Sequence, residues 1–358
     1  MRGTETKQAT MLSLLSPEQR VPRDHPLRRI KQLADAALQQ LSPVFDQMYS
    51  AMGRPSVPPE RLLKASLLMA FYSVRSERLF CEQLDYNLMF RWFLDMNMIE
   101  ESFDHSTFSL NRERLLEHEV AARFLAAVVE QARAAGLMSD EHFTVDGTLI
   151  DAWASMKSFQ LKQPGRQKPP DDPGNPTVDF HGEKRTNQTH ESKTDPESEL
   201  ARRGPGQPAR LAFSGHALME NRHGLLVDLR IAGANESERE VALTLLEKHV
   251  VGPATVGGDR AYDMRGFVGG CRTLNITPHV TQYERRPSSI DGRTTRHDGY
   301  RISQRVRKRI EEIFGWLKTV ANFRKTPFRG IAKTQLAAHL TEAAYNLLRI
   351  ARLSAAPT

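Results

Sequence analysis

The fold is decided by residues 142–153, which read HFTVDGTLIDAW. This stretch is short, rich in β-branched and aromatic residues, and contains Gly147, which favours a turn. It predicts a strand that either continues past the glycine or turns back as a hairpin. Asp146 lies inside this apolar signal, where a carboxylate is costly to bury without a positive partner. A metal ion is one such partner, and an ordinary turn with Gly147 is the alternative.

Upstream of this strand the sequence predicts helices only, because apolar residues recur at helical spacing around a proline-rich break at 54–60. The expected helical stretches are 26–52, 58–96, 105–117 and 118–135. Two short amphipathic pieces, 76–85 and 87–96, are compatible with a helix-turn-helix. Packing inside an ordinary helical bundle explains the same pattern at least as well.

Downstream of the strand, further strands alternate with helices. The expected strands are 215–221, 224–232, 255–263 and 277–282, and the expected helices are 264–273, 307–323 and 332–353. Gly224 supplies the positive φ for a turn between the first two strands. A capping box at Ser237 and Glu240 opens one more helix. Antiparallel strands followed by strand-helix-strand predict an α+β fold with a mixed sheet flanked by helices.

These patterns divide the chain into a flexible N-terminus at 1–20, an all-helical domain at 21–136 and a sheet domain at 137–353. The sheet domain carries an insert at about 157–212, which is crowded with Pro, Gly, Lys and Arg and shows almost no apolar periodicity. We expect this insert to be mobile and basic, without a core element. It is either a phosphate-binding loop or a passive linker.

Bulk composition points to a polyanionic partner. The net charge is +7 with 26% charged residues, so nucleic acid is favoured, although a solvated basic surface explains the charge equally well. Only Cys81 and Cys271 are present, which fits a reducing cytosol and excludes a disulfide framework or a multi-cysteine zinc site. No stretch has the length and apolar character of a signal peptide or a membrane span. We expect a cytoplasmic protein without a membrane partner.

Two further acids complete a candidate site. Asp259 ends the strand signal TVGGD, and strand ends are where α/β sheets place ligand groups, although capping of the next helix is the alternative. On the predicted helix, Arg307, Glu311 and Lys318 fall within about 40° of one face, together with Gln304. An ion-pair ladder produces the same spacing, and Glu312 is the rival acid.

Carboxylates in a basic setting suggest phosphoryl chemistry. Residues 285–309 carry nine Arg or Lys against two Asp. Hard oxygen ligands without clustered His or Cys select Mg²⁺ or Mn²⁺. Two such ions can activate a water or a 3′-hydroxyl and stabilise the leaving oxygen in a displacement at phosphorus. This is the chemistry of cutting and joining DNA.

The chain resembles the DDE transposases of bacterial insertion sequences, whose catalytic domain is similar to ribonuclease H. The family signature Tyr-x2-Arg-x3-Glu-x6-Lys falls on Gln304, Arg307, Glu311 and Lys318, with the Tyr replaced. Four segments resemble family segments and together span most of the chain. They are DHSTFSLNRERL at 104–115, TVDGTLIDAW at 144–153, GDRAYD at 258–263 and RKRIEEIFGWLK at 307–318.

The resemblance implies a ribonuclease-H-like catalytic domain in which Asp146, Asp259 and Glu311 hold two Mg²⁺ or Mn²⁺ ions. It implies that Arg307 and Lys318 contact DNA, and we expect the same of Arg260 and Arg305. The replacement of Tyr by Gln304 puts one DNA contact in doubt.

The partners implied are the inverted repeats that end the transposon and the target DNA, with no small-molecule substrate. The helical domain is expected to help bind the ends. Joining two ends predicts a homodimer on DNA, near the bacterial nucleoid.

Two other functions fit parts of the sequence. Residues 144–151 resemble the first motif of haloacid-dehalogenase phosphatases, but Thr144 stands at the nucleophile position, so no aspartyl-phosphate can form there. A regulator or transposase relic that binds DNA ends without cutting fits the composition and the helical N-terminus equally. Retention of all three acids in register with two bases argues against decay.

Overall fold

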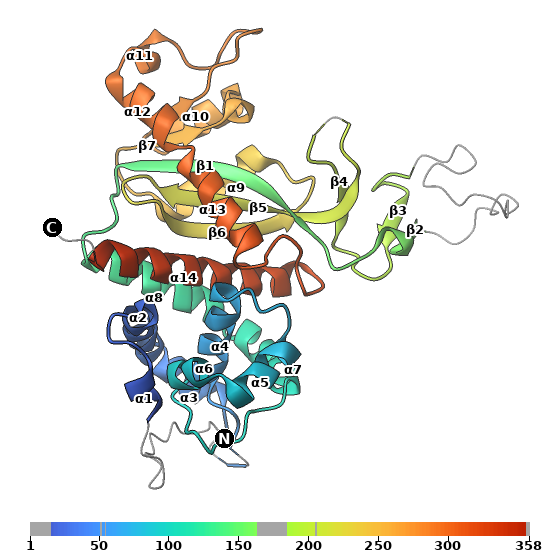
Figure 1. The fold of residues 1–358 in the computed structure, drawn as a ribbon. Coiled ribbons are helices and arrows are strands. Elements are labelled where there is room, and N and C mark those ends of the chain that lie inside the picture. Colours follow the sequence, from blue (N-terminus) through green and yellow to red (C-terminus); the bar gives the residue numbers. More distant parts are fainter. Residues whose placement is uncertain (1–15, 51, 54, 163–184, 205, 356–358) are drawn as a thin grey trace, which may run out of the picture.

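The computed structural model describes residues 16–355 apart from 51, 54, 163–184 and 205. Most of the predicted flexible N-terminus, and the middle of the predicted insert, lie outside the described residues. Figure 1 shows a helical region on one side, a sheet on the other, and the long C-terminal helix α14 (Ile331–Ala355) between them. None of the described helices combines the length and apolar character needed to span a bilayer.

The described chain before the sheet is entirely helical, as predicted. Its helices are α1 (Pro17–Arg20), α2 (Pro26–Gln40), α3 (Ser42–Met48), α4 (Pro59–Phe71), α5 (Glu77–Tyr86), α6 (Leu88–Phe93), α7 (Ser106–Glu117) and α8 (Val120–Ala134). Their apolar faces form one core, which α14 completes with Leu340, Ala344 and Leu347. The C-terminal helix therefore ties the helical region to the sheet. The two pieces considered as a helix-turn-helix are α5 and α6, and their contact with DNA stays a prediction.

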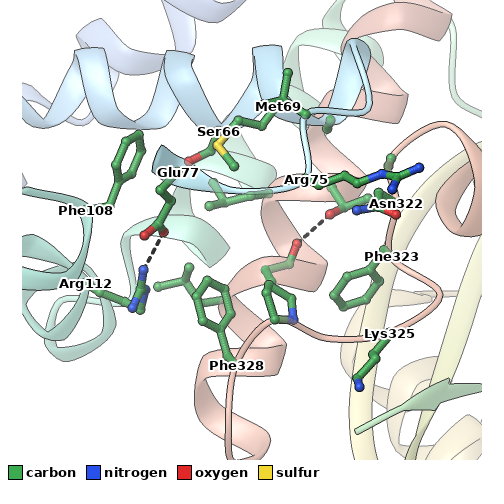
Figure 2. Close-up of a pocket in the computed structure, with 18 of the residues that line it drawn as sticks. Ser66, Met69, Arg75, Glu77, Phe108, Arg112, Asn322, Phe323, Lys325 and Phe328 are labelled. Carbon is green, nitrogen blue, oxygen red and sulfur yellow. Dashed lines mark hydrogen bonds and ion pairs between the residues drawn. The ribbon is translucent and has the colours of Figure 1, made fainter. Parts of the chain in front are cut away.

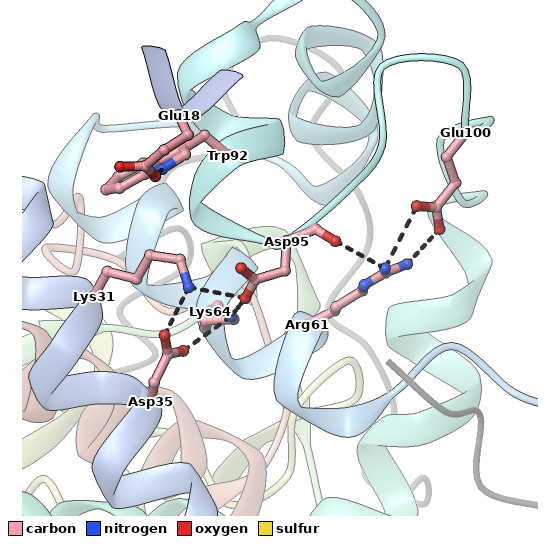
Figure 3. Close-up of polar contacts among 8 residues, drawn as sticks. All are labelled: Glu18, Lys31, Asp35, Arg61, Lys64, Trp92, Asp95 and Glu100. Carbon is pink, nitrogen blue, oxygen red and sulfur yellow. Dashed lines mark hydrogen bonds and ion pairs between the residues drawn. The ribbon is translucent and has the colours of Figure 1, made fainter. Parts of the chain in front are cut away.

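A cluster of alternating charges is buried among these helices (Figure 3). The Lys64 side chain is 1% exposed, and its Nζ lies 3.0 Å from Asp35 Oδ1 and 2.5 Å from Asp95 Oδ2. Lys31 Nζ bonds the same two carboxylates at 2.6 and 2.8 Å. We call Lys31, Asp35, Lys64 and Asp95 the Lys64 cluster. Its two positive and two negative groups satisfy one another.

The sheet has the ribonuclease-H-like order β6-β5-β1-β7-β8. Its strands are β1 (His142–Asp151), β5 (Arg210–Glu220), β6 (Leu225–Gly233), β7 (Ala254–Gly258) and β8 (Ile276–Val280). The pairs β1–β5 and β5–β6 are antiparallel, whereas β1–β7 and β7–β8 are parallel. The hairpin predicted at Gly224 is present, with φ of 71° at that residue. The antiparallel pairing of β1 with β5 also argues against the phosphatase reading of β1, because that fold has a parallel sheet.

Helices cover both faces of the sheet. α9 (Glu238–His249) and α10 (Arg265–Thr273) pack on the face that carries Phe143 and Val145, while α13 (Arg309–Thr319) and α14 pack on the face that carries Ile150. Successive residues of a strand point to opposite faces, so Asp146 faces α13 and Gly147 faces α9.

Two predictions of helix geometry are corrected. The helix expected over 307–323 spans only Arg309–Thr319 (α13), and Gln304 lies on a separate helix, α12 (Asp298–Val306), so it does not share the helix of Glu311. Ser237 precedes α9 but makes no side-chain capping bond.

The segment at 157–212 does contain ordered elements, β2 (Phe159–Leu161), β3 (His190–Ser192) and β4 (Glu199–Ala201), together with the start of β5. The prediction that it holds no core element is wrong at its ends, where Phe159 and Leu211 join the core. Its mobility stays a prediction. α11 (Gly292–Thr295) leads into α12 within the basic stretch.

Candidate active site

Strand register brings Asp146 and Asp259 side by side. β1 and β7 pair in parallel from His142 and Thr255 up to Thr144 and Gly257. Two residues further along the same register, β1 reaches Asp146 and the chain after β7 reaches Asp259. The two strands stop pairing at this point, so both carboxylates lie at the opening where they separate.

Burial and neighbouring acids act together on Asp146. Desolvation is the main cause that raises the pKa of this carboxyl to about 7, and the negative charges of Asp259 and Glu238 add to it. The Gly147 N–H, which donates to Asp146 Oδ1 at 2.9 Å, and the charge of Arg307 act in the opposite direction. Burial, together with the neighbouring acids, therefore outweighs the Gly147 hydrogen bond and the charge of Arg307.

Asp259 combines two of the roles considered for it. Its Oδ1 accepts the Ala261 N–H at 2.7 Å and so caps the short 3₁₀ helix Arg260–Tyr262. Burial is the main cause that raises the pKa of Asp146 and of Glu238, and the charge of Asp259 adds to both. The Asp259 carboxylate therefore lies near these two acids.

Helix α13 presents Glu311 between two bases that reach β1. Arg307, just before the helix, acts electrostatically on Asp146. Lys318, near its end, donates from Nζ to Thr148 Oγ1. Glu311 lies two turns before Lys318 and therefore on the same face of α13, and its side chain is exposed. This face is turned toward β1.

The rival acid Glu312 belongs to another side of α13. Its negative charge contributes to the raised pKa of Tyr345, which lies on α14. The Tyr345 hydroxyl in turn donates to Gly224 O at 3.2 Å, at the hairpin end of β5 and β6. Glu312 thus lies on the side of α13 that faces α14, and the assignment of Glu311 to the site stays a prediction.

Lys318 is held in an unusual state for a lysine. Burial is the main cause that lowers its pKa to about 8, and the nearby cations Arg203 and Arg324 lower it further. The charges of Asp151 and Asp146 oppose these effects. The Lys318 ammonium group therefore lies near two arginines and near the carboxylates of Asp151 and Asp146.

The other predicted DNA contacts differ in availability. Gln304 donates from Nε2 to His279 O at 2.6 Å, and its Oε1 accepts from Thr281 Oγ1 at 2.7 Å and from Arg307 Nε at 3.2 Å. It thus orients Arg307. Arg305 is exposed, and Arg260 is exposed with an ion pair to Glu284 at 3.6 Å.

Glu238 is the acid that the sequence patterns did not identify. It is the first residue of α9, and its Oε1 accepts from the Tyr262 hydroxyl at 3.0 Å. Burial is the main cause that raises its pKa, Asp259 adds to this, and the Gly147 N–H lowers it. The Gly147 N–H also donates to Asp146 Oδ1. In the sequence, Glu238 is marked only by its position at a helix start, and this does not distinguish it from an ordinary first-turn acid.

The donor set fits a divalent cation by its chemistry. Carboxylate oxygens with an excess of negative charge are the ligands that Mg²⁺ and Mn²⁺ prefer. Within the part of the chain that the structure describes, no three His, Cys, Asp or Glu side chains are grouped closely enough to enclose an ion. Asp146 and Asp259 are neighbours by strand register, but they do not enclose an ion with a third acid of the described residues in this arrangement.

A cavity of about 410 Å³ lies elsewhere, between the helical region and the segment 321–328. Figure 2 shows Met69 and Phe108 on one side and Phe323 and Phe328 on the other, with the Glu77–Arg112 ion pair at its edge. None of Asp146, Asp259 and Glu311 lines it. The chemistry predicted for this chain is therefore not located in this cavity.

Two family models match this chain. Residues 15–114 match a family described as "Transposase domain (DUF772)", and residues 185–347 match one described as "Transposase DDE domain". Together they take in well over half of the chain. The chain belongs to the DDE transposases. The DDE match contains Asp259 and Glu311, whereas Asp146 lies between the two matched segments. Neither match favours a regulator that only binds DNA ends.

Comparison with solved structures finds transposases as well. The chain is similar to a piggyBac transposase synaptic complex with hairpin DNA, at 10% identity and a TM-score of 0.42 over 92% of this chain and 76% of that chain. It is also similar to a pre-cleavage Mos1 transpososome, at 13% identity and a TM-score of 0.20 over 85% and 82%. No curated protein matches the transposase. The family assignment rests on the two domain matches.

Proposed function

We propose that this transposase cuts DNA at the terminal inverted repeats of an insertion sequence and joins the freed ends to target DNA. The observation that carries this proposal is the register of β1 and β7, which places Asp146 beside Asp259 where the strands separate. Glu311 on the facing helix supplies the third carboxylate. Two Mg²⁺ or Mn²⁺ ions held by these residues would supply activation of the attacking oxygen and stabilisation of the leaving one.

The bases around the acids have separate tasks in this proposal. Arg307, oriented by Gln304, lies close to Asp146 and is placed to contact a phosphate beside the cut. Lys318 holds Thr148 on the next inward-facing position of β1. Exposed Arg305 and Arg260 extend the positive surface along which the backbone of the DNA would lie.

Assembly follows from the reaction. Two transposon ends must be joined in one event, so we expect a homodimer on DNA, acting at the nucleoid where its substrate is found. Size measurement of the protein on end DNA, against the protein alone, tests the dimer. A single protein copy bound to paired ends would contradict it.

The direct test is metal-dependent nicking of DNA that carries the element's ends. We expect Asp146→Asn, Asp259→Asn and Glu311→Gln each to reduce nicking by at least about 100-fold while end binding persists in a gel shift. Glu312→Gln is the matched control and should keep nicking activity. Full activity in Glu311→Gln, with loss in Glu312→Gln, would transfer the role to Glu312.

A further inference from the structure

Asp146 and Asp259 lie where the neighbouring strands β1 and β7 stop pairing. β1 and β7 pair only as far as Thr144 and Gly257, so no strand fills the space beside Asp146 and Asp259. The face of α13 that carries Glu311 also carries Lys318, whose Nζ donates to Thr148 Oγ1 of β1. Glu238 approaches the two aspartates from the opposite face of the sheet, because α9 begins at this end of the sheet.

Gly147 makes room for Glu238. A Cβ at position 147 would overlap the Glu238 carboxylate, whose Cδ would be 3.0 Å away. The φ of Gly147 is not in the left-handed region, so the backbone conformation alone does not require glycine there. What this position requires is the missing side chain, which lets the carboxylate approach the backbone next to Asp146.

Tyr262 fixes the direction of the Glu238 carboxylate. This tyrosine is 1% exposed and packs on Phe267 with ring centroids 4.9 Å apart, so its hydroxyl is rigidly placed. The hydroxyl donates to Glu238 Oε1 at 3.0 Å. Tyr262 comes three residues after Asp259, so the bond couples α9 to the end of β7. An acid that only capped its helix would not need this partner.

We propose that Glu238 is a fourth carboxylate of the metal site and binds the divalent ion shared with Asp146 and Asp259. This rests on the proposed function, because it assigns one more ligand to the same centre. Glu238 and Glu311 would then close on the ion from the two faces of the sheet. Tyr262 acts as a positioning residue for this ligand.

The test is Mn²⁺ binding by the metal-free full-length protein, measured by calorimetry and by the Mn²⁺-induced rise in melting temperature. We expect Glu238→Gln to weaken binding by about ten-fold or more, with no loss of melting temperature in the absence of metal. Glu238→Asp keeps the charge and shortens the side chain, so it should weaken binding too. Glu240→Gln, on the exposed side of the same helix, is the matched control and should bind as the unmodified protein does.

Two further variants act on the geometry alone. Tyr262→Phe keeps the packing and removes the hydroxyl, and we expect a smaller loss of Mn²⁺ affinity, about three-fold. Gly147→Ala displaces the carboxylate and should lower affinity as much as Glu238→Gln does. Affinity unchanged in Gly147→Ala and Glu238→Asp, with loss in Glu238→Gln alone, would show a charge effect and overturn the assignment.

Parallel measurement of Asp146→Asn separates this inference from the proposed function. If Asp146→Asn loses Mn²⁺ binding while Glu238→Gln keeps it, the metal site stands and the Glu238 assignment is wrong. If both variants bind Mn²⁺ like the unmodified protein, the proposed metal site itself is wrong. Loss in both supports the assignment.

Discussion

Two charge clusters of this protein, one among the helices and one at the sheet, are built on opposite principles. In the Lys64 cluster two lysines alternate with two aspartates at 2.5–3.0 Å, and every charge has an opposite neighbour. Where β1 and β7 separate, burial is the main cause that raises the pKa of Asp146 and of Glu238, and the charge of Asp259 adds to both. Arg307 is the base that acts on Asp146. Within the Lys64 cluster the opposite charges compensate one another, whereas the acids near Asp146 need a bound cation to compensate their charge.

The difference separates a structural role from a functional one. A satisfied ion cluster orders the helices that contribute to it, and removing one partner leaves an uncompensated charge. An unsatisfied acidic cluster costs stability in the free protein and is retained where a cation or a substrate compensates it. Substitutions in the two clusters should therefore change the free energy of unfolding in opposite directions.

The largest effect is expected at Lys64. Replacing it by Met removes the charge that lies between Asp35 and Asp95, and we expect the free energy of unfolding to fall by about 3 kcal/mol. Chemical denaturation measures this. Arg29→Met, at an exposed position of α2, is the control and should stay within about 0.5 kcal/mol. An unchanged free energy of unfolding in Lys64→Met would contradict the contrast between the two clusters.

Replacing Asp146 is expected to raise the free energy of unfolding of the metal-free protein. Burial raises the pKa of this carboxyl to about 7 in the folded protein, from a model-compound value of 3.8, so its contribution to stability falls as the pH rises between those values. Metal-free Asp146→Asn should thus be more stable than the unmodified protein at pH 8, by on the order of 2 kcal/mol. The two proteins should converge at pH 4. Thermal unfolding across pH checks this, and Mn²⁺ should reverse the order.

A smaller effect is expected at Lys318. Its pKa is lowered to about 8, chiefly by burial, so the side chain loses its positive charge as the pH rises through that value. Affinity for end DNA should fall between pH 7 and pH 9, and Lys318→Arg should remove this dependence. Lys318→Met should lower the slope of log affinity against log salt by about one. An identical pH profile in Lys318→Arg would place the titrating group elsewhere.

Much of the fold follows from local patterns. Apolar spacing marks α2, α4 and α8 as helices, and β-branched residues mark β1, because these periods reflect one buried face of each element. The turn at Gly224 follows from the one residue type that adopts its φ without strain. Asp146 stands out because it lies inside an apolar strand signal and Asp259 because it ends one, although a turn or a cap explains each of them alone and the family resemblance is what singles them out.

Long-range geometry decided the rest. The register of β1 on β7, the break between α12 and α13, and the side of α13 that carries Glu312 depend on packing between segments far apart in the chain. Glu238 illustrates the reason. Its position at a helix start is ordinary, and only the pairing of strands and the missing side chain of Gly147 bring its carboxylate beside Asp146. By itself the sequence determined which residues are acidic and which elements carry them, since those are local properties. The tertiary structure decided which acids meet, because the distance between two carboxylates is set by strands and helices that the intervening sequence does not describe.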